Sequence, residues 1–481
     1  MQAITADRAW PLYDIAATRH IEQAAAASLP VHALMQRAGL AVARLALAVA
    51  PHARTIWIAC GPGNNGGDGL EAAAQLQSHG KHAVVTWPGD AGRLPVDAQA
   101  SLRHAQAAGV IFASEPPASC DLVIDALLGI GSNRAPQGQL AAWIEAINAQ
   151  PAPVLGVDIP SGLDADTGSG TSVRASHTLA LLALKPGLFT NGGRDACGRV
   201  WLDSLAAGAT RETPAPIAWL ASPPPPKSRL HASHKGSYGD VAVIGGAPGM
   251  AGAALLAASA ALHAGAGRVF VGLLDTNAMA LAAAQPELML RRWESLPLAG
   301  QHVACGCGGG DAIRAVLPLV LSTAGSLVLD ADALNAVAAD SQLQSLLQAR
   351  SRRKDRPTVL TPHPLEAARL LGSSTAQVQA DRLAAAQALA RRFGCTVLLK
   401  GSGSIVAAPG QLPSINPTGN ARLATAGTGD VLAGCVAARL AAGSPPFEAA
   451  AGAAWLHGLA ADRWPAHRPL LAADLARTLH F

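Results

Sequence analysis

The feature that most constrains the fold is a repeated order in which a short apolar stretch ends in a glycine-rich or acidic turn and a helical pattern follows. The first such stretch is Thr55–Cys60, followed by the turn GPGNNGGDG and a helical pattern up to about His79. Strand, glycine turn and helix in this order begin a βαβ unit, which implies a parallel sheet with helices against its faces. Further apolar stretches end at Ile124 and Val157. The sequence therefore predicts a doubly wound α/β fold.

A second series of the same kind begins at Gly239–Gly245, beyond a proline-rich stretch. Four consecutive prolines, Pro223–Pro226, cannot lie in a helix or a central strand, so they predict a stiff linker. A chain of 481 residues also exceeds what one hydrophobic core usually holds. We therefore predict two doubly wound three-layer domains, a Rossmann-like one at 1–216 and a second one at 228–481, joined by a linker at 217–227.

The composition argues against several classes of protein. The formal net charge is only +4 and most arginines are scattered, so we expect no nucleic-acid-binding surface. The seven cysteines form no CxxC pair and show no metal-ligand spacing, which is typical of a reducing compartment. The first residues do not have the pattern of a signal peptide, and no apolar run is long enough for a membrane span. We expect a cytoplasmic protein that acts on small molecules.

Polar residues gather where the strands of the first domain end. Asn64, Asn65 and Asp68 crowd the first glycine turn, and Asp125 and Asp158 follow the later strands. Ligands of open parallel sheets bind at the carboxyl ends of the strands, so these residues could meet over one crevice. Their amide and carboxylate oxygens suit a polar ligand or a cation. Taken singly, Asp125 and Asp158 could be helix caps.

The stretch NPTGNARLATAGTGDVLAG, residues 416–434, carries the strongest chemical signal of the second domain. Its glycine-rich turn ends at Asp430, where a helical pattern begins. Amides that converge at a helix N-terminus bind an anion, and a carboxylate beside them can take the proton of a hydroxyl, as phosphoryl transfer requires. Taken alone, a helix cap is an equally good interpretation of Asp430. Lys400 shifts the balance, because it ends a buried strand at a Gly-Ser-Gly-Ser turn where it can meet phosphate oxygens.

Two further groups of residues remain open to more than one interpretation. Asp330, Asp332, Asn335 and Glu366 follow strands and suit Mg²⁺ held through water, although any one of them alone is more often a cap. His363 lies between two prolines on a rigid turn, where contact with substrate and a structural role are equally good interpretations.

As a set, the motifs GPGNNGGDG, DALLGIG and VDIPSGLDADTG resemble the NAD(P)H-hydrate epimerase family over residues 10–210. The resemblance implies interconversion of the R and S forms of NAD(P)H hydrated at C6, with a potassium ion held by Asn65, Asp125 and Ser161. The reaction needs proton transfer at a C–O centre, for which Asp158 is our first candidate and Asp68 the second. The residues implied to bind the hydrate are Asn64, Asn65, Gly66, Gly67, Asp68, Gly129, Ile130, Gly131, Ser132, Asn133, Arg134, Ala135 and Asp158.

The motifs KGSGS, NPTGN, ATAGTGDVLAG, DADALN and TPHPLE resemble the NAD(P)H-hydrate dehydratase family over residues 228–481, which implies a ribokinase-like fold. In that family a nucleotide phosphorylates the C6 hydroxyl of the S hydrate, and phosphate then leaves to restore NAD(P)H. Asp430 would be the base of this reaction. The residues implied to bind the hydrate are Ala253, Gly308, His363 and Asp430, and those implied to bind the nucleotide are Lys400, Gly401, Ser402, Gly403, Ser404 and Gly429.

The chain departs from the second family at two places. Gly306-Cys-Gly-Gly-Gly310 replaces the usual GPGLG, and His363-Pro-Leu-Glu366 replaces HPGE. Neither change removes a group that does chemistry, so we predict a bifunctional repair enzyme for the hydrates NADHX and NADPHX. The residues suit either ADP or ATP, and resemblance to the fused bacterial form implies ADP, together with Mg²⁺ and a homo-oligomer. The alternatives are a ribokinase-like small-molecule kinase and a nucleotide-binding scaffold whose second site is inactive.

Overall fold

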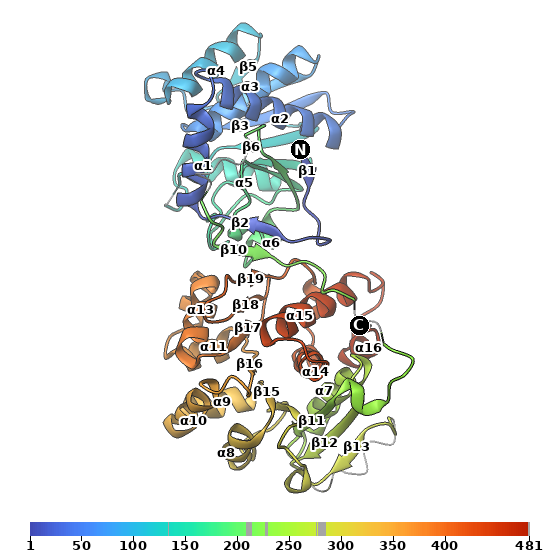
Figure 1. Cartoon of the computed structure of the whole chain (residues 1–481). Helices are drawn as coiled ribbons and strands as arrows, with labels where there is room; N and C mark the ends of the chain where they lie inside the picture. Colours follow the sequence, from blue (N-terminus) through green and yellow to red (C-terminus); the bar gives the residue numbers. More distant parts are fainter. Residues whose placement is uncertain (133, 208–213, 227–228, 276, 278–284, 480–481) are drawn as a thin grey trace. The chain divides into compact units, whose positions relative to one another are not determined.

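The computed structural model describes residues 1–132, 134–207, 214–226, 229–275, 277 and 285–479, and the chain divides into two compact units (Figure 1). The first unit contains residues 1–5 and 10–218, and the second contains residues 6–9 and 219–481. The chain passes from one unit to the other at Ala218–Trp219, within the stretch predicted as a linker. Within the described residues, no helix combines the length and the apolar character that a membrane span requires.

The first unit is built on an eight-stranded sheet in the order β1-β9-β8-β7-β6-β3-β4-β5, parallel throughout except for the pair β1–β9. Its strands are β1 (Gln2–Ala3), β3 (Thr55–Cys60), β4 (His82–Thr86), β5 (Ile111–Ala113), β6 (Leu122–Ala126), β7 (Val154–Val157), β8 (His177–Leu181) and β9 (Arg199–Asp203); β2 (Trp10–Leu12) is a further short strand. Its helices are α1 (Ile15–Ala27), α2 (Ala33–Val49), α3 (Asn64–Ser78), α4 (Val96–Ala107), α5 (Gln139–Ala149) and α6 (Gly193–Ala196).

Side-chain alternation along the strands gives this sheet two separate cores. Ile56 and Ile58 of β3 pack in one core with residues of α2, α3 and α4. Trp57, which lies between them in the chain, packs in the other core with Trp143 and Ile144 of α5. Successive residues of a strand point to opposite faces, so a central strand that is apolar throughout must be covered on both sides. The predicted three-layer arrangement is therefore confirmed for this unit.

The sheet of the second unit runs in the order β13-β12-β11-β14-β15-β16-β17-β18-β19, with β10 beside β19. It is parallel from β13 to β17, and β18 pairs antiparallel with both of its neighbours. Its strands are β10 (Ala218–Leu220), β11 (Asp240–Gly245), β12 (Arg268–Leu273), β13 (Met289–Arg291), β14 (His302–Cys305), β15 (Ser326–Leu329), β16 (Thr358–Leu360), β17 (Thr396–Leu399), β18 (Ile405–Ala407) and β19 (Ser414–Ile415).

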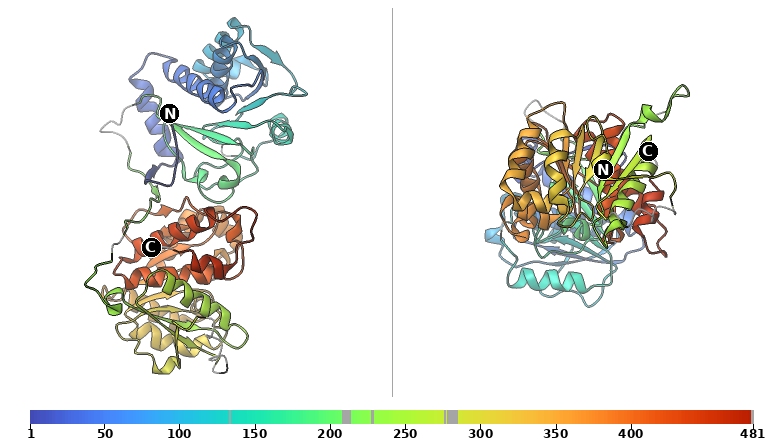
Figure 2. Two further views of the ribbon diagram at one scale, coloured as in Figure 1. Left: turned by 90° about the vertical axis from the view of Figure 1, so that its right-hand side faces the viewer. Right: turned by 90° about the horizontal axis from the view of Figure 1, so that it is seen from below.

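Helices cover both faces of this second sheet (Figure 2). One face packs against α7 (Ala251–His263), α14 (Thr428–Ala441), α15 (Pro446–Asp462) and α16 (Ala472–Arg477), in a core that includes Val241, Val243 and Val328 of the strands. The helices on the other face are α8 (Ile313–Thr323), α9 (Asp332–Ala339), α10 (Ser341–Ser351), α11 (Pro364–Leu371), α12 (Thr375–Ala380) and α13 (Arg382–Phe393).

Three predicted positions differ from the observed ones. Helix α3 begins at Asn64, so Asn64, Asn65 and Asp68 lie in its first turns rather than in a loop. A Cβ at Gly66 would lie 2.0 Å from the carbonyl oxygen of Gly61, so glycine at this position lets the first turn of α3 pack closely against the preceding turn. Asp125 lies inside β6 rather than after it, and α14 begins two residues before Asp430.

Candidate functional site

The first unit contains a cavity of about 780 Å³ beside the carboxyl ends of β3, β6 and β7. The predicted residues that line it are Asn64, Asn65, Asp68, Gly129, Ile130, Gly131, Ser132 and Asp158. Four other predicted residues, Gly66, Gly67, Arg134 and Ala135, are not part of the lining, and Asn133 lies outside the described residues. The crevice predicted at the strand ends therefore exists, although some of its motif residues lie behind its wall.

Asp158 is held at the cavity wall by a buried ion pair. Its backbone has φ = +66°, a left-handed conformation that aspartate adopts rarely. The amide of Leu181 donates to Asp158 Oδ1 at 3.0 Å, and the ammonium of Lys185 pairs with the same oxygen. Lys185 has no exposed surface. These contacts fix one oxygen of Asp158 at the cavity wall.

Sequence reasoning missed Lys185. The signal was present, because the chain has few lysines and this one follows an apolar strand at a Pro-Gly turn. Its partner, Asp158, follows another strand, however, and the pairing of β7 with β8 brings the two together.

Two further carboxyl groups of the cavity have raised pKa values. Burial raises the pKa of Asp68 well above its usual range, and the charges of Asp158 and Glu22 raise it further. Burial also raises the pKa of Glu22, and the charge of Asp158 adds to the effect. The cavity thus combines a carboxylate paired with an ammonium and a carboxyl that can give a proton, which is a usual way to divide acid and base roles.

The residues predicted to hold potassium lie next to this cavity. Ser161 donates to both oxygens of the buried Asp125 carboxylate, from its hydroxyl at 2.5 Å and from its amide at 2.8 Å. Burial raises the pKa of Asp125 to about 6. Nδ2 of Asn65 is buried and has no hydrogen-bond partner among the described residues. If the amide were turned over it would present its oxygen instead. The available donors are therefore oxygens, which suit a hard cation.

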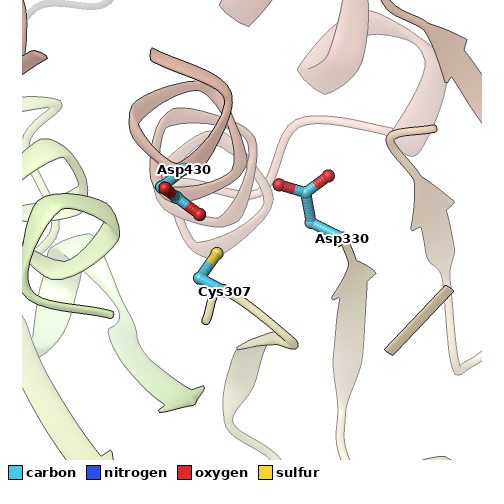
Figure 3. A group of neighbouring side chains, drawn as sticks. All are labelled: Cys307, Asp330 and Asp430. Atoms are coloured by element: carbon cyan, nitrogen blue, oxygen red, sulfur yellow. The ribbon is translucent and has the colours of Figure 1, made fainter. Parts of the chain in front are cut away.

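In the second unit, three side chains that come from separate parts of the chain, one of them Asp430, lie close together (Figure 3). Cys307 follows β14, Asp330 follows β15, and Asp430 lies in the first turn of α14. The thiol of Cys307 and one carboxylate oxygen of each aspartate lie within 4.8 Å of one another. A thiol does not suit Mg²⁺, so we interpret the group as the surroundings of a base. Lys400 pairs with Asp330 at 2.6 Å and lies 3.9 Å from Glu366.

The groups around Asp430 bring the pKa of its carboxyl closer to neutral pH. Burial raises its pKa to about 6, and the charge of Asp330 adds to the increase. A hydrogen bond with Cys307 and the charge of Lys400 act in the opposite direction. Burial raises the pKa of the Cys307 thiol well above its usual range, so the thiol is the donor. A carboxylate with a pKa near the operating pH is well matched to general base catalysis.

The predicted substrate and nucleotide residues of the second unit fall into two groups. Ala253 and Gly308 are neighbours, since a Cβ added to Gly308 would lie 2.9 Å from that of Ala253. A Cβ added to Gly429 would lie 3.4 Å from Nζ of Lys400, so the lysine reaches the start of α14. The remaining nucleotide residues, Gly401, Ser402, Gly403 and Ser404, form the turn between β17 and β18.

Arg382 was also missed by sequence reasoning. Its side chain is 1% exposed, and its guanidinium donates to the carbonyl of Lys400 at 3.2 Å. It therefore supports the turn from behind. An arginine at the start of a helical pattern has no feature in the sequence that would single it out.

His363 has a structural role in this structure. Its Nδ1 accepts from the amide of Leu365 at 3.1 Å, and its Nε2 lies 3.2 Å from a carboxylate oxygen of Glu366. Glu366 in turn accepts from the amide of His363, which completes a capping box at the start of α11. Burial raises the pKa of Glu366 to about 7. Contact between His363 and a substrate stays a prediction.

The residues predicted to hold Mg²⁺ already have partners. Asp332 accepts from the amide of Gly310 at 2.9 Å, and Asn335 accepts from Arg369 at 2.7 Å. Each uses one such contact, so an indirect role through water, as predicted, is compatible with this arrangement.

Comparisons with known proteins give matches in both units. A family model described as NAD(P)H-hydrate dehydratase matches residues 241–480, and one described as YjeF-related protein N-terminus matches residues 31–187. The bifunctional NAD(P)H-hydrate repair enzyme of Escherichia coli (strain K12) is 39% identical over 484 residues, which cover 95% of this chain and 90% of that protein.

Two further relatives match about half of the chain. The ADP-dependent (S)-NAD(P)H-hydrate dehydratase of Neisseria meningitidis serogroup B is 48% identical over 243 residues, 49% of this chain and 80% of that protein. A crystal structure of the ADP/ATP-dependent NAD(P)H-hydrate dehydratase of Bacillus subtilis, grown with ATP and Mg²⁺, has 30% identity and a TM-score of 0.46; the match covers 52% of this chain and 91% of that one.

Proposed function

This chain belongs to the family of bifunctional NAD(P)H-hydrate repair enzymes, and we propose that its two units repair NADHX and NADPHX in sequence. The first unit epimerises the R and S hydrates. The second unit dehydrates the S hydrate to NAD(P)H at the expense of ADP, which becomes AMP and phosphate. With both activities on one chain, the R hydrate is converted to the S hydrate, so the stereospecific dehydration step can consume both forms.

In the second unit, Asp430 accepts the proton of the C6 hydroxyl as the hydroxyl oxygen attacks the terminal phosphoryl group of ADP. Lys400 and the amides at the start of α14 stabilise the charge of the transferred group. Phosphate leaves more readily than hydroxide, so the ring nitrogen expels it and loss of a proton from C5 completes NAD(P)H. Mg²⁺ bound with the nucleotide would neutralise phosphate charge, and Asp332 and Asn335 would hold it through water.

In the first unit, Asp68 protonates the C6 hydroxyl as its C–O bond breaks and water leaves, while the ring nitrogen stabilises the cation at C6. Asp158 then takes a proton from the water that adds to the opposite face of C6, which inverts the configuration. The contact of Asp158 with Lys185 and the raised pKa of Asp68 support this division of roles. Asn65, Asp125 and Ser161 would hold a potassium ion, whose charge would stabilise the negatively charged phosphate groups of the ligand. The unpartnered amide of Asn65 supports this assignment.

The observation that carries the dehydratase assignment is the convergence of Lys400, Gly429 and Asp430 at one helix terminus. Asp430→Asn should abolish ADP-dependent recovery of NAD(P)H, while epimerisation of the hydrates continues. Asp355→Asn is a matched control, because Asp355 is exposed on a loop. Loss of both activities in a folded Asp430→Asn protein would contradict two independent sites.

Two finer expectations belong to the same proposal. ADP is favoured over ATP because the Neisseria relative is named as ADP-dependent, and parallel assays with the two nucleotides test it. A homo-oligomer follows from the family resemblance, and light scattering of the purified chain measures its mass.

A further inference from the structure

Helix α1 (Ile15–Ala27) forms a wall of the first unit's cavity, although no motif pointed to it. Five of its residues line the cavity: Thr18, Arg19, Glu22, Gln23 and Ala26. Their spacing of three and four places them on one face of the helix. The face that an amphipathic helix usually buries in a core is here turned toward a ligand site.

Thr18 is the member of this wall that lacks a partner. Its side chain is only 3% exposed, and no residue in the described part of the chain forms a hydrogen bond with its hydroxyl. A buried hydroxyl without a hydrogen bond costs free energy, so buried hydroxyls are almost always paired. Thr18 lines the cavity, so a polar group of a bound ligand can supply the missing hydrogen bond to its hydroxyl.

Glu22 lies one helical turn beyond Thr18 and faces the same space. Its carboxyl is close enough to Asp158, Lys185 and Arg19 for their charges to affect its ionisation. The pair thus offers a hydroxyl that donates and a carboxyl oxygen that accepts, roughly 6 Å apart between their Cβ atoms. A primary carboxamide presents the complementary pair, a carbonyl that accepts and an amino group that donates.

We propose that Thr18 and Glu22 bind the carboxamide of the hydrated nicotinamide ring in the epimerase site. Thr18 donates to the carboxamide oxygen and Glu22 accepts from the carboxamide nitrogen. The contact would orient C6 of the ring toward Asp158 and Asp68, which line the same cavity. The inference rests on the proposed epimerase function of this cavity and adds the residues that recognise the ring itself.

The test compares Thr18→Val, Thr18→Ser and Glu22→Met with the unaltered full-length chain. A mixture of R and S NADHX is incubated with ADP, and the slower phase of NADH recovery reports epimerisation. We expect kcat/KM of that phase to fall about threefold to tenfold in Thr18→Val and about tenfold or more in Glu22→Met, with Thr18→Ser near the starting value. Glu145→Met is a matched control on the exposed side of α5.

The dehydratase reaction of the same chain separates the possible failures. Its fast phase should be unchanged in every variant, which shows that the protein is folded. Absence of any slow phase in the unaltered chain would contradict the proposed epimerase function itself. An unaltered slow phase in Thr18→Val and Glu22→Met would overturn only the carboxamide assignment.

A substrate analogue tests the chemical class directly. The hydrate of reduced 3-acetylpyridine adenine dinucleotide has a methyl group in place of the carboxamide nitrogen. With it, Glu22→Met should cost no more than the control, because the contact it removes is already missing. An equal loss with both substrates would contradict recognition of the carboxamide by Glu22.

Discussion

Replacement of Cys307 by alanine should move the acid limb of the dehydratase rate profile to higher pH. Cys307 stands where the family usually has proline, and its thiol donates to the carboxylate of Asp430. The other charged groups that act on this carboxylate are Asp330 and Asp332, which raise its pKa, and Lys400, which lowers it. Alanine removes one of the two groups that favour the ionised base and leaves the others in place.

The size of the shift follows from the energy of one hydrogen bond. The base works only when ionised, so the rate should rise with pH through the pKa of Asp430, which is about 6 in the unaltered chain. A hydrogen bond of this kind contributes about 0.5–1.5 kcal/mol, and about 1.4 kcal/mol corresponds to one pKa unit. The midpoint should therefore rise by roughly 0.4 to 1 unit. The variant should be slower in mildly acid buffer and almost unchanged in mildly alkaline buffer.

The assay is the initial rate of NADH recovery from S NADHX at saturating ADP, measured across this pH range. Cys307→Ser keeps a donor and should leave the midpoint near its original value. Cys395→Ala is a matched control, since Cys395 is also buried but does not contribute to the pKa of Asp430. A midpoint that stays in place in Cys307→Ala, or moves to lower pH, would refute the role of the thiol.

Three further substitutions test other parts of the two sites. Lys185→Met leaves the buried Asp158 without its ammonium, so the unfolding free energy of the first unit should fall by roughly 3 kcal/mol and epimerisation should be lost; calorimetry and the slow phase of recovery measure both. Gly308→Ala forces a side chain into a backbone with φ = +58°, which should cost about 1–2 kcal/mol of stability and raise KM for the hydrate, as thermal unfolding and kinetics can show. Lys400→Met removes the partner of Asp330 and the phosphate contact that we propose for Lys400, so KM for ADP should rise about tenfold or more in steady-state assays.

The sequence was sufficient to predict the elements whose signal is local. Strand, glycine turn and helix follow one another at Thr55–Ser78, and the structure has β3 and α3 there. The meeting of Asn64 and Asp158 at one cavity was also predictable, because parallel strands bring their carboxyl ends to one edge of a sheet.

Features that depend on tertiary contacts could not be predicted in this way. The partner of Lys185 is set by the pairing of two strands, and the contact between Cys307 and Asp430 is set by the packing of α14 beside β14 and β15. The polar face of α1 has the same spacing whether it meets solvent or a ligand cavity, so its pattern alone does not distinguish the two.

The most direct test of two cooperating activities is the total recovery of NADH from a mixed R and S NADHX preparation with ADP, Mg²⁺ and K⁺. The two-site account predicts recovery of the whole hydrate pool, at a rate above that of spontaneous epimerisation. Recovery that stops at the S fraction would contradict the epimerase assignment, and no recovery with either ADP or ATP would contradict the dehydratase assignment.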